Sequence, residues 1–96
     1  MNVGYHPDVQ KDVSNILRYY DRIDPRLGNE FWAELNFFIG KAAAGPSHFH
    51  FESPGRRRVN LHRFPYHFLF REVAGGIRIT VVRGHKQHPQ RGIERR

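Results

Sequence analysis

Apolar residues recur at helical spacing through the first half of the chain. Between residues 7 and 22 they fall three or four positions apart, which predicts one apolar stripe along a helix. Asp24 and Pro25 then supply an N-cap and a first-turn proline for a second helix, which Gly45 and Pro46 end. The stripe of this second helix is Leu27, Phe31, Leu35, Phe38 and Ile39. Two antiparallel helices joined by a tight connection fit these lengths.

From about residue 57 the pattern changes to alternation, which is typical of strands. Three candidate strands are "RRVNLHRF", "YHFLFREV" and "GIRITVVRGH", with Pro65 and Gly75-Gly76 at the turns. The opening "NVGYH" predicts one more strand, residues 45–56 a long loop with room for a short extended piece, and residues 86–96 a polar tail. We therefore predict a single α+β domain over residues 1–96: an N-terminal strand, a two-helix antiparallel hairpin, and a three-stranded antiparallel meander.

Side chains along these strands divide by parity between two faces of the sheet. The face predicted to pack on the helices holds Val59, Leu61, Tyr66, Phe68, Phe70, Ile77, Ile79 and Val81. The opposite face holds Arg58, Asn60, His62, His67, Leu69, Arg71, Arg78 and Thr80. An open sheet face is polar in any two-layer domain. This one carries arginines and histidines with no acid among them, which favours a binding surface.

Charge is unevenly placed along the chain. Residues 1–55 contain 5 Lys+Arg against 7 Asp+Glu, a net charge of −2, whereas residues 56–96 contain 11 against 2, a net charge of +9. A field of this sign attracts nucleic acid or an acidic protein partner. The chain has no cysteine, which excludes disulfides and thiolate metal sites. No apolar run approaches the roughly 18 residues of a membrane span, so we expect a cytoplasmic protein without a membrane segment.

Four stretches carry these elements and together cover nearly the whole chain: "YHPDVQKDV", "YYDRIDPRLGNEFWAEL", "RRVNLHRFPYHFLF" and "VVRGHKQHP". In this order they resemble the RelE/ParE superfamily of bacterial toxins. The resemblance implies the two-layer fold of that superfamily and the toxin of a type II toxin–antitoxin system, of the plasmid stabilisation kind. Such a toxin arrests growth and is neutralised by a small antitoxin protein in a hetero-oligomer.

Two targets are open under this resemblance. RelE-like members cut mRNA in the ribosomal A site, as ribosome-dependent endonucleases, and ParE-like members poison DNA gyrase. An alternative from another class is a non-toxic nucleic-acid-binding module of the same fold, using the basic face.

Cleavage through the RNA 2′-hydroxyl needs a base, an acid and positive charge for the transition state. The resemblance places Arg58 and Asn60 where RelE-like nucleases carry lysines, and His67 where they carry an arginine. Gln87, or Lys86 after a one-residue shift, falls where an arginine follows the last strand. The terminal tyrosine has no counterpart in "RGIERR". These missing groups leave enzymatic activity uncertain and favour the gyrase-directed subgroup.

Histidine exchanges protons near neutral pH, so the candidate catalytic residues are Arg58, His67 and His85. The candidate target- or antitoxin-binding residues are Arg58, Asn60, His62, Arg71, Arg78 and Lys86. His48 and His50 stand at the spacing of a metal pair, but only Glu52 is near enough to add a ligand, so no metal site is predicted. The sequence carries no glycine-rich phosphate loop, and no cofactor is expected.

Overall fold

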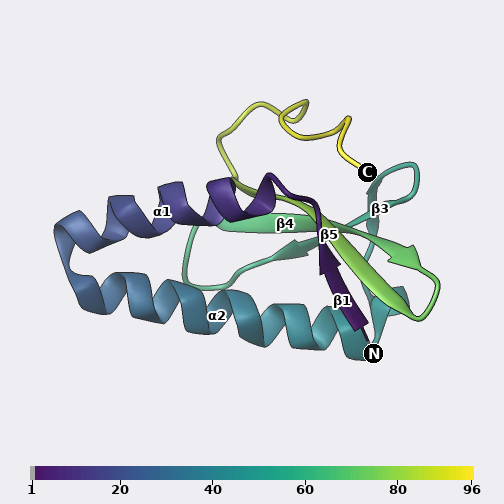
Figure 1. Ribbon diagram of the computed structural model, residues 1–96, viewed down its shortest axis with the longest axis horizontal. Helices are drawn as coiled ribbons and strands as arrows, with labels where there is room; N and C mark the ends of the chain where they lie inside the picture. The colour runs from purple at the N-terminus through teal and green to yellow at the C-terminus, as the bar shows by residue number, and fades with distance from the viewer. Residues whose placement is uncertain (1) are drawn as a thin grey trace.

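The computed structural model, which describes residues 2–96, has two layers, a helical hairpin and a five-stranded mixed sheet (Figure 1). The helices are α1 (Val9–Ile23) and α2 (Pro25–Ala44), and a short 3₁₀ turn, η1 (Pro46–His48), follows them. The strands are β1 (Asn2–Tyr5), β2 (Phe51–Ser53), β3 (Arg56–Asn60), β4 (Tyr66–Val73) and β5 (Gly76–Gly84). None of the helices in residues 2–96 is both long enough and apolar enough to cross a membrane.

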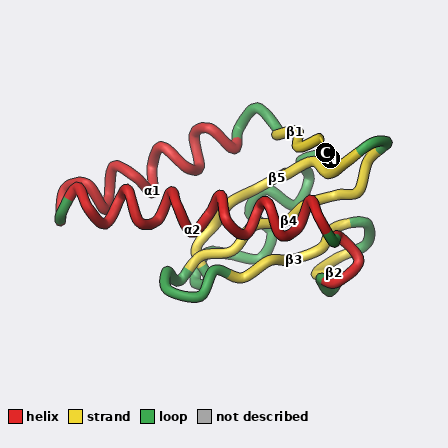
Figure 2. Tube along the Cα trace, turned by 90° about the horizontal axis from the view of Figure 1, so that it is seen from below, coloured by secondary structure: helices red, strands yellow, loops and turns green. Residues whose placement is uncertain are grey.

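The predicted helical hairpin is confirmed. Asp24 has an extended backbone and its side chain accepts a hydrogen bond from the Arg26 N–H (2.9 Å), with Pro25 in the first turn. This cap ends one helix and starts the next within one residue, so the two helices must run antiparallel. In Figure 2, α2 crosses over β4 and β5, and its buried Phe31 and Leu35 belong to the same core as the sheet.

The sheet has the order β1-β5-β4-β3-β2. The β3–β4–β5 meander is antiparallel, as predicted. The N-terminal strand adds a parallel edge, because Asn2–Tyr5 pairs with residues 76–79 of β5. Gly76 allows this approach, since a Cβ there would lie 1.9 Å from the Asn2 carbonyl oxygen. Within the predicted loop of residues 45–56, the short β2 forms the other edge of the sheet.

Two details of the predicted strands are wrong. β3 ends at Asn60, so His62 and the rest of "LHRF" lie in the connection to β4 and not on a sheet face. Val81 does not face the helices. Leu69 pairs with Val81 and Phe70 with Ile79, so a β-bulge leaves Thr80 without a cross-strand partner. The extra residue moves every later side chain of β5 to the opposite face of the sheet. Val82 therefore takes the helix-facing core position that was predicted for Val81.

Residues 86–96, predicted as a polar tail, fold back over the sheet face opposite the helices and are called the C-terminal segment below (Figure 1). Gly92, with φ +75°, lies so close to Val81 that a Cβ there would be 2.7 Å from that side chain. The segment therefore covers the apolar pair Leu69 and Val81, both 0% exposed. The bulge explains this packing, because it turns Val81 toward the open face of the sheet, which was expected to be polar.

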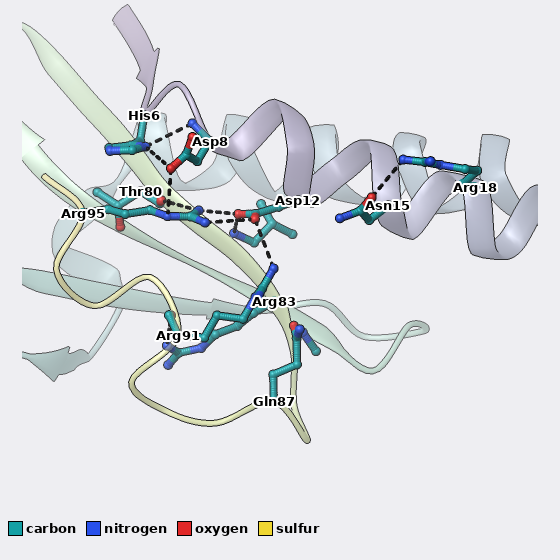
Figure 3. A network of polar contacts seen from close by, with 12 residues as sticks. His6, Asp8, Asp12, Asn15, Arg18, Thr80, Arg83, Gln87, Arg91 and Arg95 are labelled. Carbon is teal, nitrogen blue, oxygen red and sulfur yellow. Dashed lines mark hydrogen bonds and ion pairs between the residues drawn. The ribbon is translucent and has the colours of Figure 1, made fainter.

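Asp12 connects α1, β5 and the C-terminal segment (Figure 3). Its carboxylate is buried, and Oδ2 accepts a hydrogen bond from the Val82 N–H (3.1 Å). β1 ends opposite Ile79, so this N–H lies on an edge of β5 that no strand covers. Arg95 adds two further hydrogen bonds, Nη1 to Oδ2 (2.6 Å) and Nη2 to Oδ1 (3.2 Å). The buried Asp12 carboxylate thus accepts the hydrogen bond of an otherwise unpaired N–H at the edge of β5 and also holds the end of the C-terminal segment through Arg95.

We expect Asp12→Ala to lower the free energy of unfolding by about 3 kcal/mol, because it leaves the Val82 N–H without an acceptor and removes the buried carboxylate that pairs with Arg95. Chemical denaturation measures this change. Asp21→Ala, on the exposed surface of the same helix, is the matched control and is expected to change stability little. Equal effects of the two substitutions would contradict a structural role of the Asp12 carboxylate.

Candidate functional site

A cluster of polar side chains crosses the sheet face opposite the helices, near the end of β5. Cross-strand register brings them together, since Asn60 of β3 pairs with His67 of β4, and His67 pairs with Arg83 of β5. The members of this polar cluster are Glu52, Arg58, Asn60, His67, Arg83 and His85. The bulge in β5 is what puts Arg83 on this face.

Arg83 lies at the centre of the polar cluster and is 1% exposed. Its Nε–H donates to His67 Nε2 (2.9 Å), and Nη2 reaches Glu52 Oε2 (3.4 Å). Nη1 donates to the carbonyl oxygens of Pro89 (2.7 Å) and Arg91 (2.9 Å) in the C-terminal segment. Burial lowers the pKa of the guanidinium, while the charge of Glu52 acts in the opposite direction.

The tautomers of the two histidines follow from this network. His67 accepts at Nε2, so the neutral ring carries its proton on Nδ1, which lies 2.9 Å from Nδ1 of His85. His85 must then accept at Nδ1 and carry its own proton on Nε2. The two rings are stacked, with centroids 5.1 Å apart and an interplanar angle of 9°.

Protonation of His67 is strongly disfavoured. Burial lowers its pKa to about 3, and the charges of Arg58 and Arg83, followed by His85, add to the shift. The pKa of His85 is also lowered, first by its partial burial and then by Arg58, although the residue is exposed. Both rings are therefore neutral at pH 7. His67 has no free nitrogen, so only His85 can exchange a proton with a bound molecule.

Arg58 forms the outer part of the polar cluster. Its Nε donates to Asn60 Oδ1 (2.7 Å), Nη1 reaches Glu52 Oε1 (3.4 Å), and Nη2 approaches His85 Nδ1 (3.4 Å). Glu52 therefore lies between Arg58 and Arg83 and offsets part of their positive charge. Asn60 holds the Arg58 side chain along the strand.

The other predicted site residues lie elsewhere. The His62 ring packs 4.6 Å from the Phe38 ring of α2, away from the polar cluster. Arg71 and Arg78 are opposite one another on β4 and β5, toward the other end of the sheet. Lys86 is exposed and follows His85 directly. The structure thus brings together Arg58, Asn60, His67 and His85, with Lys86 beside them.

Sequence reasoning missed Arg83 and Glu52. Simple alternation from Ile77 puts Arg83 on the face that packs against the helices, where a charged residue does not belong. That conflict was the available signal for a bulge in β5. Glu52 gave no comparable signal, because β2 is only three residues long and lies within a stretch that reads as a loop.

A groove of about 770 Å³ opens beside His85, between α1 and the end of β5. Asn15 and Tyr19 line one wall, and Lys86 and Gln87 line the other. Gln87 is fixed there because its Oε1 accepts from the Gly84 N–H (2.7 Å). Within residues 2–96, no group of three or more His, Asp or Glu side chains is arranged to hold a metal ion.

The lowered pKa of His67 makes a prediction about acid stability. Between pH 6.5 and about 3 the unfolded chain binds a proton that the folded chain rejects, so the free energy of unfolding falls as the pH falls. The contribution is at most about 1.4 kcal/mol per pH unit. We expect His67→Gln, which can still accept from Arg83, to have a shallower loss of stability over this range. Denaturant unfolding at pH 7, 5.5 and 4 measures the two slopes.

Carboxylates titrate in the same range, so only the difference between His67→Gln and the parent protein reports on His67. The control is His50→Gln, an exposed histidine outside the polar cluster. Parallel curves for all three proteins would show that His67 is protonated in the folded state.

The architecture matches that of a solved structure. A chain described as the chromosomal ParDE TA system from P. aeruginosa superimposes with a TM-score of 0.76 and 18% sequence identity. The match covers 88% of this chain and 95% of that one. Neither the family models nor the curated proteins compared with the chain give a match. The likeness confirms the predicted RelE/ParE-like fold, with the correction that the sheet is mixed.

Proposed function

We propose that this protein is the toxin of a type II toxin–antitoxin system, that it arrests growth by binding DNA gyrase, and that a small antitoxin neutralises it in a hetero-oligomer. The observation that carries the proposal is the fold shared with the ParDE chain over 88% of this protein. The strongly basic C-terminal half supports it, because a field of that sign attracts an acidic partner.

The chemistry of the polar cluster favours binding over cleavage. A general acid or base needs a nitrogen or oxygen within reach of the substrate and a pKa suited to proton exchange. His67 meets neither condition, since both ring nitrogens are engaged and its pKa is about 3. Two of the three Arg58 nitrogens contact Asn60 and Glu52. The cluster thus acts as a rigid support for the surface above it.

Ribosome-dependent mRNA cleavage is the second candidate, and one observation favours it. His85 is exposed, and its Nδ1 lies 3.4 Å from Arg58 Nη2, so a base and a positive charge stand side by side. Because Nε2 of His85 already carries a proton, the 2′-hydroxyl would have to replace the His67 N–H at Nδ1 of His85. His85 would then accept the 2′-hydroxyl proton at Nδ1, and Arg58 would stabilise the extra negative charge.

Inducing the gene alone in bacteria and following thymidine and methionine incorporation separates these candidates. We expect growth arrest with thymidine incorporation falling first, and unchanged arrest by His85→Ala. Co-expression of the small protein encoded beside the gene is expected to restore growth. The matched control for the substitution is His50→Ala.

The opposite order, with methionine incorporation falling first and His85→Ala inactive, would assign the protein to mRNA cleavage. Harmless expression at high level in several hosts would refute both toxin mechanisms. The chain would then be the non-toxic nucleic-acid-binding module, for which binding should weaken steeply as salt concentration rises.

A further inference from the structure

The groove beside His85 lies between α1 and the end of β5 and shares only that histidine with the polar cluster. Its volume of about 770 Å³ is within the range of sites that hold a small organic molecule. It is called the α1 groove below. Six of its lining residues have side chains that can contact a ligand, namely Asn15, Tyr19, Tyr66, Lys86, Gln87 and Arg91.

The two amide side chains of the α1 groove have their oxygens already engaged. Arg18 Nη2 donates to Asn15 Oδ1 (2.9 Å), as Figure 3 shows, and the Gly84 N–H donates to Gln87 Oε1 (2.7 Å). These donors fix the orientation of each amide, since a nitrogen in place of either oxygen would meet another N–H. In the described part of the chain, Asn15 Nδ2 and Gln87 Nε2 have no acceptor. Both amides therefore offer N–H donors to a ligand.

The available charge in the α1 groove is positive. Arg91 Nη2 lies 3.8 Å from Asp12 Oδ1, but the Asp12 carboxylate is buried and already pairs with Arg95 at 2.6 Å. Lys86 has no carboxylate within ion-pair distance among the residues that the structure describes. His85 carries its proton on Nε2. Apart from two tyrosine hydroxyls, the groove thus presents N–H donors whose side-chain acceptors are used up.

Two tyrosine rings give the α1 groove flat apolar surfaces. Tyr19 is 52% exposed, and its ring meets the buried Tyr20 ring edge to face, with centroids 5.1 Å apart and an interplanar angle of 74°. Tyr66 is held by similar contacts with Tyr20 (6.1 Å) and Phe31 (5.5 Å). Aromatic side chains in such positions are the surfaces on which nucleic-acid bases stack. The ring of Tyr19 is thus available to a planar ligand.

We propose that the α1 groove binds a nucleotide, with its base stacked on Tyr19 and its phosphate paired with Lys86 and Arg91. Donors without free acceptors select a ligand rich in acceptor oxygens, and the phosphate group and the carbonyl groups of uracil or guanine meet this requirement. A peptide fits less well, because each of its residues brings an N–H that finds no side-chain acceptor here. The proposal goes beyond the toxin function and does not depend on it.

The test is a titration of the purified full chain with uridine 5′-monophosphate (UMP) at low salt, followed by NMR. UMP is the probe because uracil has two carbonyl acceptors. The side-chain NH₂ signals of Asn15 and Gln87 report on the groove directly, and we expect both to shift and saturate. Tyr19→Leu should weaken binding about tenfold, whereas Tyr19→Phe, which keeps the ring, should change it by less than about twofold.

The phosphate contact is tested with Lys86→Gln against Lys11→Gln, an exposed lysine of α1 outside the groove. We expect Lys86→Gln to weaken UMP binding about fivefold and Lys11→Gln to weaken it by less than about twofold. Uridine, which has no phosphate, should bind the parent protein and Lys86→Gln equally. Inorganic phosphate, which has no base, should bind at least about tenfold more weakly than UMP.

Inorganic phosphate binding as tightly as UMP would overturn the proposal, because the groove would then be a simple anion site. Equal weakening by the two lysine substitutions, or full binding by Tyr19→Leu, would also overturn it, since net charge alone would hold the nucleotide.

Tetrauridylate separates the two sources of a nucleotide. Tighter binding than UMP would identify RNA as the source, and equal or weaker binding would identify the free nucleotide. The proposal requires either ligand to lose affinity in Tyr19→Leu, and it fails if neither does. All of these measurements are made on the isolated protein, so failure of the proposed toxin function would be seen separately.

Discussion

The buried guanidinium of Arg83 is the contact on which the arrangement of the open sheet face depends. A charge that is 1% exposed is tolerable only when its N–H groups find acceptors, and here they find four separate residues. Glu52 belongs to an edge strand, His67 to a central strand, and the Pro89 and Arg91 carbonyls to the C-terminal segment. One side chain thus fixes β2, the histidine pair and the segment relative to one another.

This arrangement also sets the character of the open face around Arg83. The charges there are compensated by Glu52 and the histidines are held neutral, so the region is internally satisfied. A partner gains little by contacting groups that already have partners. Toward the other end of the sheet Arg71 and Arg78 face one another across β4 and β5, so the two ends of the open face differ in how their charges are matched.

The sequence was sufficient for the parts of the fold set by local patterns. Helical periodicity, the Asp24-Pro25 boundary and the alternation in the last forty residues predicted the hairpin and the meander. The parallel pairing of β1 with β5 could not be derived from alternation, because it joins residues more than 70 positions apart. The bulge at Thr80 had one signal in the sequence, the charge of Arg83 at a position that alternation gives to the core, and nothing in the pattern says at which residue the register shifts.

Part of the polar cluster was also predictable from the sequence. Arg58, Asn60, His67 and His85 were expected together and lie together, since they depend on strands that were correctly placed. Arg83 lies beyond the bulge, and the same alternation continued to residue 83 would put it on the wrong face. The role of the C-terminal segment was hidden for two reasons. Its contacts with Arg83 and Arg56 are made by backbone carbonyls, which carry no sequence signal, and its Arg95 side chain pairs with an acid 83 positions earlier in the chain.

The pairing of Asp12 with Arg95 has a consequence for how the protein is made. These residues are 83 positions apart, and β1 can pair only after β5 has been synthesised. The contacts that close the domain therefore join residues that are far apart in the sequence. During synthesis, α1 leaves the ribosome before any partner of its buried carboxylate, Val82, Arg91 or Arg95, has been made. Folding of the complete domain must then follow translation of almost the whole chain, and contacts of this range make it slow. A chain cut short before residue 95 would lack the guanidinium that makes the shortest contact with the buried carboxylate of its first helix.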